Sequence, residues 1–226
     1  MGVTLPSFRH DTAAVASARR AEELGLDGVF VFDHLWPMGR PDRPALSCFP
    51  LLAAVAASTS DIHVGPLVAR VGTVSDDLLI AQFLTLAAMA PQRVVAALGT
   101  GDAKSADENR AYGIPYPPAG ERRLAVARCA RQLQEAGLPV WIGGGARPTV
   151  ELARDLSAAV NLWGAQPAAV ASLAARFEVT WGGPVSGSAA VITEWLVELA
   201  AAGATWAVCA WPGSLEAVAE AAQAVR

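Results

Sequence analysis

The chain has 226 residues, of which 53% are hydrophobic and 17% are charged, and its net charge is −4. This length and composition predict one domain with a substantial core, and the acidic balance without a basic face argues against nucleic acid as a partner. The three cysteines and three histidines show no metal-ligand spacing, so no protein-built metal site is expected. The chain shows neither a signal-peptide pattern nor an apolar run of membrane-spanning length, so we expect a cytoplasmic protein without membrane contact.

Short apolar runs alternate with longer stretches of helical period along the chain, a pattern typical of parallel α/β folds. The expected strands lie at residues 3–5, 28–32, 62–68, 94–98, 139–142, 159–163, 178–181 and 205–211. The expected helices cover about 11–24, 45–58, 76–89 and 119–136, and four more begin near 149, 167, 188 and 214. Eight strands and eight helices predict a compact (β/α)8 TIM barrel with residues 1–226 as its single domain. A doubly wound open sheet is the alternative, but no Gly-x-Gly-x-x-Gly follows the first strand.

Polar residues follow the second expected strand, at the end of a barrel where chemistry takes place. Asp33 and His34 come directly after the apolar start of that strand, and Trp36 follows them. The pair joins a carboxylate to the only side chain that titrates, unperturbed, near neutral pH. A histidine held by hydrogen bonds inside a turn is the structural alternative.

The fourth expected strand ends in Gly99-Thr100-Gly101-Asp102. In a closed barrel the second and fourth strands are two positions apart, so we expect Asp102 and His34 to face one another across the mouth. One protonated and one unprotonated group on opposite sides of a substrate carbon form a general acid/base pair. The alternative for Asp102 is a helix cap, a common role for aspartate after such a turn.

The segment after the fifth expected strand has the features of an anion site. Gly143, Gly144 and Gly145 free the backbone amides to converge, a helix begins next, and Arg147 adds a permanent positive charge. We expect a phosphate to bind here, and a flexible strand-to-helix turn is the alternative.

Five short stretches occur in a fixed order along the chain, at residues 21–28 (AEELGLDG), 32–35 (FDHL), 80–82 (IAQ), 91–102 (PQRVVAALGTGD) and 140–144 (VWIGG). Together they resemble the luciferase-like superfamily of flavin- and deazaflavin-dependent oxidoreductases. Asp33-His34 and the Gly-Thr-Gly-acid sequence resemble most the branch that uses coenzyme F420, which includes F420-dependent glucose-6-phosphate dehydrogenases.

The resemblance implies roles for individual residues. His34 matches the residue that moves the substrate hydroxyl proton, and Asp102 stands where the family has a glutamate as the second acid/base group. Leu67 and Val68 fall where the family often has a non-prolyl cis peptide against the flavin ring. Combined with the anion site inferred above, the expected catalytic residues are His34, Asp102 and Trp36, and the expected cofactor-binding residues are Asp33, Leu67, Val68, Gly101, Gly143, Gly144, Gly145 and Arg147.

The chain also departs from the family. Met38 stands where the sugar-phosphate dehydrogenases have a catalytic tryptophan, and Lys104 is the only lysine available for a sugar phosphate, so glucose 6-phosphate is not the expected substrate. The segments between the fourth long helix and the fifth strand, and around the seventh strand, are shortened to a few residues. Because these segments help cover the substrate in the family, an open site, a large substrate and a loss of catalysis are the alternatives.

Four functional hypotheses follow. The first is an F420-dependent oxidoreductase that transfers a hydride between the deazaflavin and an unidentified small organic substrate, with Trp36, Trp181 or Trp211 as pocket walls. The others are an FMN-dependent monooxygenase, a flavin-binding protein without activity, and a phosphate-binding barrel of unknown chemistry. The apolar helix at 78–89 either packs on the barrel or forms a homodimer interface, and the sequence leaves both open.

Overall fold

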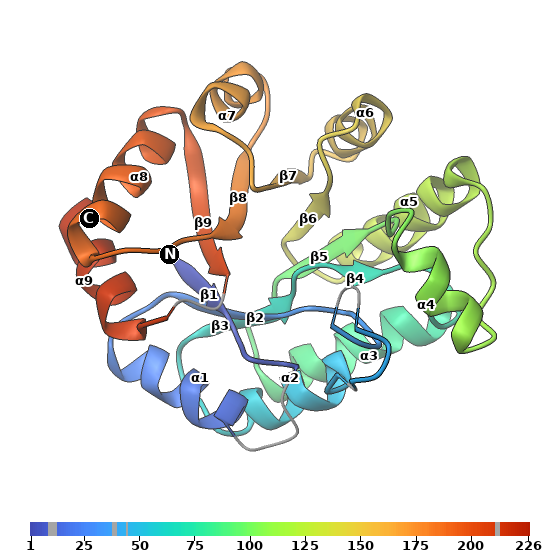
Figure 1. Ribbon diagram of the computed structural model, residues 1–226. Coiled ribbons are helices and arrows are strands. Elements are labelled where there is room, and N and C mark those ends of the chain that lie inside the picture. Colours follow the sequence, from blue (N-terminus) through green and yellow to red (C-terminus); the bar gives the residue numbers. More distant parts are fainter. Residues whose placement is uncertain (9–12, 38–39, 44, 211–212) are drawn as a thin grey trace.

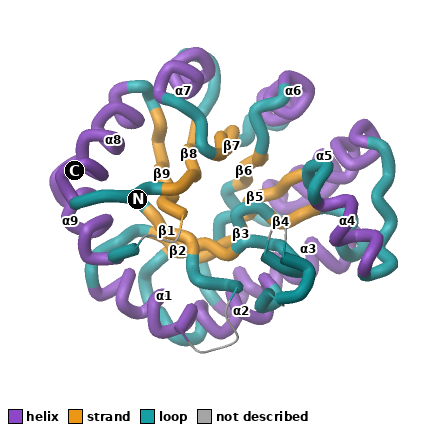
Figure 2. Tube along the Cα trace, viewed as in Figure 1, coloured by secondary structure: helices purple, strands orange, loops and turns teal. Residues whose placement is uncertain are grey.

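A single parallel sheet, ringed by helices, organises the chain in the computed structural model, which describes residues 1–8, 13–37, 40–43, 45–210 and 213–226 (Figure 1). Figure 2 shows the helices as an outer ring around the strands. The strands are β1 (Gly2–Thr4), β2 (Gly28–Val31), β3 (His63–Pro66), β4 (Ala69–Arg70), β5 (Ala96–Gly99), β6 (Val140–Gly143), β7 (Ala159–Trp163), β8 (Val179–Pro184) and β9 (Ala204–Ala210). The helices are α1 (Ala13–Glu23), α2 (Cys48–Ala56), α3 (Asp76–Met89), α4 (Ser105–Ala111), α5 (Ala119–Glu135), α6 (Arg147–Asp155), α7 (Pro167–Ala174), α8 (Ala189–Ala201) and α9 (Leu215–Val225).

The strand order is β3-β2-β1-β9-β8-β7-β6-β5-β4, and all neighbouring strands run parallel. The two ends of this order meet at Val64 of β3, which forms a parallel bridge with Val94 just before β5. The amide of Val64 donates to the carbonyl of Arg93 at 2.8 Å, and the amide of Val95 donates to the carbonyl of Val64 at 3.0 Å. The predicted TIM-barrel architecture is therefore confirmed, as a nearly closed barrel.

The third expected strand is split into two. β3 pairs with β2, β4 pairs with β5, and the Leu67–Val68 peptide bond between them is cis. The Val68 side chain lies against two glycines: a Cβ on Gly99 would come within 2.4 Å of a Val68 methyl carbon, and a Cβ on Gly143 within 2.9 Å. Glycine at these two strand ends is therefore required by the packing of Val68. The split accounts for nine strands among the described residues where the sequence predicts eight.

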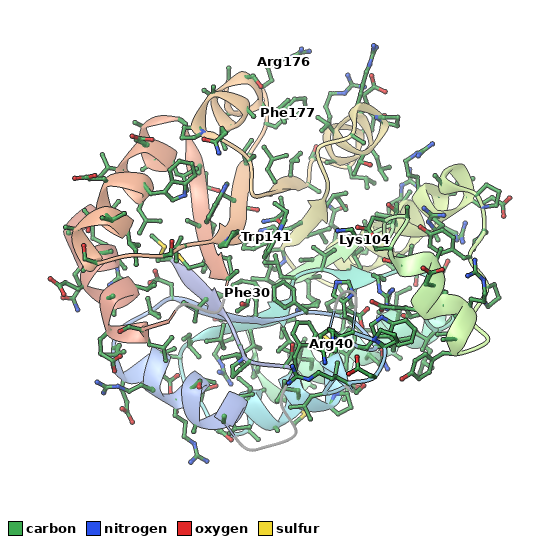
Figure 3. All side chains as sticks on the ribbon, viewed as in Figure 1. Phe30, Arg40, Lys104, Trp141, Arg176 and Phe177 are labelled. Carbon is green, nitrogen blue, oxygen red and sulfur yellow. The ribbon has the colours of Figure 1, made fainter. Side chains whose placement is uncertain are left out.

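Apolar side chains fill two separate layers. Inside the barrel, Phe30 stacks on Trp141 with ring centroids 5.4 Å apart, and Trp206 meets both rings edge-on (Figure 3 shows Phe30 and Trp141 towards the centre). The larger layer lies between the strands and the helices. Alternate side chains of each strand enter the two layers, as the pleat of a strand requires. The barrel interior is therefore a packed core rather than a pore, and a ligand reaches it only at its mouth.

Short local signals set where several helices begin. Ser75 accepts a hydrogen bond from the amide of Leu78 at 3.3 Å, and Ser214 accepts one from the amide of Ala217 at 3.2 Å. α6 and α7 each have proline in the first turn, a position where its missing N–H costs nothing. Among the described helices, none combines the length and the apolar composition that a membrane span needs.

The connections differ from the sequence expectation at one point. α4 lies between β5 and α5, where only a loop is predicted. The turns from α5 to β6 and from β8 to α8 are as short as expected, at residues 136–139 and 185–188. Two residues named from the sequence, Met38 and Trp211, lie outside the described residues, and so do the first two positions of the helix expected at 11–24.

Candidate functional site

Aromatic side chains border the mouth of the barrel, where the carboxyl ends of the strands meet. Phe8 stacks on Phe32 with ring centroids 5.9 Å apart, and Trp163 meets Phe32 edge-on at 5.4 Å. The ring of His34 lies 6.5 Å from that of Phe8 and 6.4 Å from that of Phe32. Trp163 is 48% exposed. One imidazole among three aromatic rings suits a flat aromatic ligand.

Glu108, from helix α4, holds His34 in place. Nδ1 of His34 lies 2.8 Å from Oε1 of Glu108, and the amide of Leu35 donates to Oε2 at 3.1 Å. The Glu108 side chain is 2% exposed, whereas that of His34 is 20% exposed. Both carboxylate oxygens therefore bind the loop after β2, and Nε2 of His34 makes no hydrogen bond with any described residue.

Arg70 places a buried positive charge against the same carboxylate. Its Nη2 lies 2.9 Å from Oε2 of Glu108, and the Arg70 side chain is only 6% exposed. Nη1 donates to Oδ1 of Asn109 at 3.5 Å. Nη2 and Nε, however, have no partner among the described residues in hydrogen-bonding geometry. Buried N–H groups normally have a hydrogen-bond partner, so we expect a ligand or a water molecule to accept from these two groups.

Asp33, in the loop after β2, forms a hydrogen bond with the last residue of β4. Its Oδ2 accepts a hydrogen bond from the amide of Arg70 at 2.8 Å. Burial disfavours the charged carboxylate and raises the pKa of Asp33, and the hydrogen bond and charge of Arg70 offset only part of this effect. Asp33, His34, Arg70 and Glu108 thus form one connected polar cluster that joins β2, β4 and α4.

Burial alone would raise the pKa of Glu108, but the hydrogen bonds from His34 and Leu35 and the charge of Arg70 hold it below its usual value near 4.5. A carboxylate whose pKa is lowered on folding stabilises the fold above its unfolded pKa, and this contribution disappears as the pH falls.

We therefore expect the free energy of unfolding to fall between about pH 5 and pH 3 more steeply in the wild type than in the variant Glu108→Gln. Urea unfolding at a series of pH values measures both slopes. Equal slopes for the two proteins would show that Glu108 titrates alike in the folded and unfolded states.

Asp102 makes different contacts from those expected. Its Oδ1 accepts hydrogen bonds from the amide and the hydroxyl of Ser105 at 3.0 and 3.1 Å, and its backbone carbonyl accepts one from the Tyr116 hydroxyl. Asp102 is exposed, just before α4. The structure thus gives Asp102 the bonding of a helix cap, and the carboxylate that contacts His34 is Glu108.

The tryptophans lie in different settings. Trp36 lies in the loop after β2, and its ring centroid is 5.9 Å from that of Tyr112, which follows α4. Trp181 is 1% exposed in the outer layer of the core, where its Nε1 donates to the carbonyl of Ala165 at 2.9 Å, so the expectation that it walls a pocket at the mouth is wrong. Trp163, at the end of β7, occupies the rim instead.

The turn between β6 and α6 retains the features of an anion site. Gly144 has a φ of +126°, which favours glycine, and residues 144–148 are exposed. Ala146 offers no side-chain cap to α6, so no side-chain acceptor from Ala146 competes with a ligand for the positive end of the helix dipole. Arg147 pairs with Glu151 at 2.8 Å while its side chain is 89% exposed. This turn has the groups and the space to receive a phosphate.

Residues 10–128, more than half of the chain, match the family model described as luciferase-like monooxygenase. The chain belongs to this family. It is 34% identical over 119 residues to an F420-dependent glucose-6-phosphate dehydrogenase of Kineococcus radiotolerans, covering 52% of this chain and 34% of that protein. The dehydrogenase of the same description from Beutenbergia cavernae is 38% identical over 124 residues, covering 54% and 35%. The match thus spans about a third of the length of these curated relatives.

Solved structures share the luciferase-like fold over most of the chain. An F420-dependent secondary alcohol dehydrogenase in complex with an F420–acetone adduct superposes with a TM-score of 0.86 and 13% identity, covering 100% of this chain and 98% of that one. The coenzyme F420-dependent tetrahydromethanopterin reductase of Methanopyrus kandleri gives 0.75 and 14%, covering 98% and 96%. A type II Baeyer–Villiger monooxygenase of Pseudomonas putida, in complex with FMN, gives 0.62 and 14%, covering 88% and 71%. At these identities the likeness shows the fold alone.

The rim of this luciferase-like barrel has the groups that a flavin-type cofactor needs. The rings of Phe8, Phe32 and Trp163 offer apolar faces and edges to a flat ring system. Nε and Nη2 of Arg70 lack a hydrogen-bond partner among the described residues, and the start of α6 lacks a side-chain cap. A flat ring with polar atoms and a phosphate fits this combination.

Sequence reasoning missed Glu108 and Trp163. Glu108 follows a glycine-rich strand end by nine positions, and its neighbours Asp107 and Arg110 make it look like one more charge on an exposed segment. The available signal is helical spacing: Ser105, Glu108 and Asn109 are the buried positions of α4, at intervals of three and one. Trp163 ends its strand directly before Gly164, just as Trp181 stands directly before Gly182.

Proposed function

We propose that this chain is an F420-dependent oxidoreductase that transfers a hydride between the deazaflavin and a small organic substrate. The observation that carries the proposal is the contact of His34 Nδ1 with the buried Glu108 carboxylate at 2.8 Å, beside the aromatic rim of the barrel. The match to F420-dependent dehydrogenases supports the cofactor class. Because that match spans only a third of those proteins, their sugar-phosphate substrate is not transferred to this chain. When bound, F420 supplies a two-electron hydride acceptor or donor.

His34 is the proposed catalytic proton carrier. The lowered pKa of Glu108 keeps its carboxylate ionised at neutral pH, so Glu108 accepts and Nδ1 of His34 carries the hydrogen of their bond. A neutral imidazole in this tautomer has its lone pair on Nε2, which can take a proton from a substrate hydroxyl. Glu108 acts through His34 and is a positioning residue. Asp102, exposed at the start of α4, stays the candidate for the second acid/base group.

The proposed cofactor contacts surround the mouth of the barrel. Leu67 and Val68, at the cis peptide between β3 and β4, are the proposed contacts of the flat ring, and the turn before α6 is the proposed phosphate site. Trp36 is the proposed side wall near α4. The full set of proposed cofactor-binding residues is Asp33, Leu67, Val68, Gly101, Gly143, Gly144, Gly145 and Arg147.

An FMN-dependent monooxygenase is the second candidate, supported by the description of the matching family and by the shared fold with an FMN-containing monooxygenase. A flavin-binding protein without activity is the third. It is favoured by the short connections at residues 136–139 and 185–188, which leave little chain to cover a substrate. The cytoplasmic location stays a prediction from the sequence.

Binding of the two cofactors separates these candidates. We expect F420 to bind with a dissociation constant of about 1 μM or below, which corresponds to roughly 8 kcal/mol, and FMN to bind more weakly. Fluorescence titration of the purified protein measures both. Arg147→Glu is expected to weaken binding by about tenfold through charge repulsion of the phosphate, whereas Arg131→Glu, on the exposed face of α5, serves as the matched control. Tighter binding of FMN would favour the monooxygenase, and binding of neither cofactor would overturn all three candidates.

We also propose that the protein forms a homodimer through α3. Leu78, Leu84 and Met89 on its outer face are 49%, 41% and 44% exposed, so the helix is apolar on the side away from the barrel as well. Sedimentation equilibrium tests this pairing, with Leu84→Glu expected to give monomers. A monomeric wild type would overturn it.

A further inference from the structure

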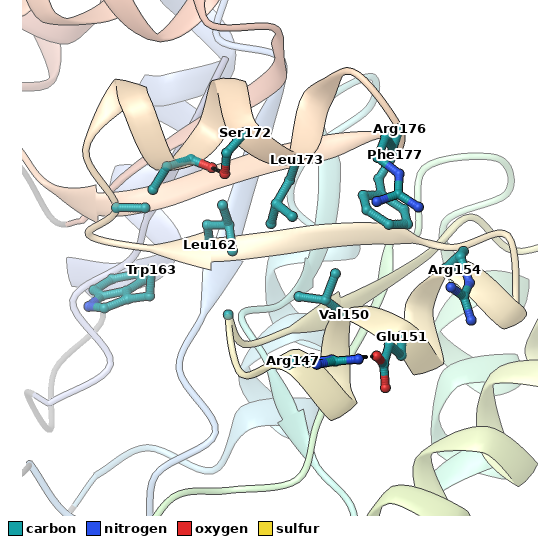
Figure 4. A pocket seen from close by; sticks show the side chains of 13 residues that line it. Arg147, Val150, Glu151, Arg154, Leu162, Trp163, Ser172, Leu173, Arg176 and Phe177 are labelled. Carbon is teal, nitrogen blue, oxygen red and sulfur yellow. Dashed lines mark hydrogen bonds and ion pairs between the residues drawn. The ribbon is translucent and has the colours of Figure 1, made fainter.

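A groove lies on the outside of the barrel between α6 and α7, and strand β7 forms its floor (Figure 4). Its volume is about 640 Å³, which falls within the range of about 300–1,000 Å³ typical of small-molecule sites. The two helices stand apart at this point in the ring (Figures 1 and 2). The lining residues are Gly145, Arg147, Val150, Glu151, Arg154, Leu162, Trp163, Ala165, Ala169, Ser172, Leu173, Arg176 and Phe177.

The middle of the groove is apolar. Leu162 of β7 and Val150 of α6 are largely buried at its base, and Leu173 contributes from α7. Figure 4 shows these three side chains between Trp163 at one end and a pair of arginines at the other. A ligand that lies along this floor therefore needs an elongated apolar part.

Arg154 and Arg176 lie at the same end of the groove, one from the end of α6 and one just after α7 (Figure 4). The Arg176 guanidinium lies 5.9 Å from the centroid of the Phe177 ring, and it forms no ion pair with any described residue. Within the described part of the chain, Arg154 pairs only with its sequence neighbour Asp155. Both side chains are more than half exposed, and such pairs contribute little to stability. Two guanidinium groups are thus available at one end of an apolar channel.

The charge of the groove is opposite to that of the chain. Three arginines and one glutamate line it, while the protein carries a net charge of −4. Arg147 and Glu151 pair with each other at 2.8 Å near the rim, so the unbalanced positive charge is that of Arg154 and Arg176. This distribution matches a ligand with its negative group at the end away from the barrel mouth.

We propose that this groove binds an amphipathic organic anion, such as a medium-chain carboxylate. The apolar chain lies on Leu162 and Leu173, and the carboxylate is held by Arg154 and Arg176. A neutral lipid would leave the two guanidinium groups without a partner, and a polyanion would gain nothing from the apolar floor. The groove shares Gly145, Arg147 and Trp163 with the proposed cofactor site, but the two arginines that hold the carboxylate lie at its other end.

Calorimetric titration with decanoate, without F420 or FMN present, tests the proposal. We expect saturable binding of one decanoate per chain, and weaker binding of decanol, which lacks the charge. Arg154→Ala combined with Arg176→Ala is expected to weaken decanoate binding about tenfold or more. Ala169→Trp, at an exposed position of α7 that lines the groove, is expected to do the same by filling it. Arg131→Ala, on α5 outside the groove, is the matched control and is expected to bind like the wild type.

Thermal unfolding of each variant shows that it is folded, since the substituted positions are exposed. Equal decanoate affinity in the wild type and in the double arginine variant would overturn the proposal, and so would equal affinity for decanol. Displacement of decanoate by F420 would also overturn it, because the groove would then belong to the cofactor. Failure of F420 to bind leaves these titrations unaffected, so the two proposals fail separately.

Discussion

Replacement of Glu108 by leucine is expected to lower the free energy of unfolding by about 3–5 kcal/mol. The Glu108 and Arg70 side chains are 2% and 6% exposed, so the substitution leaves a buried guanidinium without its counter-charge. It also removes the acceptor of the Leu35 amide and of His34 Nδ1. An unsatisfied buried donor costs about 1–3 kcal/mol, and a buried charge costs more.

Urea unfolding measures this loss, and the structure provides a matched control on the same helix. Asp107 precedes Glu108 but is 73% exposed, and among the described residues it pairs only with Arg110, so Asp107→Leu is expected to change stability by less than about 0.5 kcal/mol. The double variant Arg70→Met, Glu108→Leu removes both charges and is expected to be more stable than Glu108→Leu alone. A loss below about 1 kcal/mol for Glu108→Leu would mean that water reaches the cluster and screens it.

The fold was largely predictable because its strands and helices have clear periods. The strand at 159–163 and the helix at 76–89 have the predicted bounds, since both begin and end at local signals, such as Ser75 before α3 and Pro91 after it. The split of the third strand was not predictable from its continuous apolar pattern. The split is visible only in the strand pairing of the folded chain, where β3 pairs with β2 and β4 pairs with β5.

The carboxylate partner of His34 was not predictable from the residues near it in sequence. Asp102 follows a strand end directly and was the natural candidate, but its side chain bonds to Ser105. Glu108 reaches His34 across 74 positions because α4 turns its buried face towards the loop after β2. A short helix between a glycine-rich turn and a proline-rich loop has a weak pattern, and the partner of a buried side chain on it depends on packing.

Successive residues of a strand point to opposite faces of the sheet. A difference of one position therefore decides whether a tryptophan enters the barrel interior or the outer layer. Asn161 of β7 donates to the Thr180 hydroxyl of β8 at 3.0 Å, and both side chains are buried. Trp181 follows Thr180 and therefore points to the other side of the sheet, into the outer layer. The sequence contains this alternation, but which of the two faces is the interior is set by the closed barrel.

Replacement of His34 by alanine is expected to lower turnover by about 10²–10⁴-fold, the usual contribution of a positioned acid/base group. Binding of F420 is expected to change by less than about tenfold, or 1.4 kcal/mol, because the aromatic rim of Phe8, Phe32 and Trp163 remains. Stopped-flow reduction of F420 by the substrate that the wild type oxidises measures the first quantity, and fluorescence titration measures the second.

His63→Gln is the matched control, since His63 lies at the opposite end of the barrel, where its Nδ1 contacts the Asp27 carbonyl at 3.0 Å. Glu108→Gln is expected to lower kcat with little effect on KM, because it alters how the imidazole is held and leaves the aromatic rim in place. Asp102→Asn decides whether Asp102 is a second acid/base group or a helix cap. Asparagine keeps the acceptor for the Ser105 amide, so the fold is expected to stay intact. A large loss of kcat would then support acid/base catalysis by Asp102, and an unchanged kcat would leave His34 and Glu108 as the whole proton-transfer unit. Unchanged turnover in His34→Ala would show that His34 is not the proton carrier and would overturn the proposed mechanism.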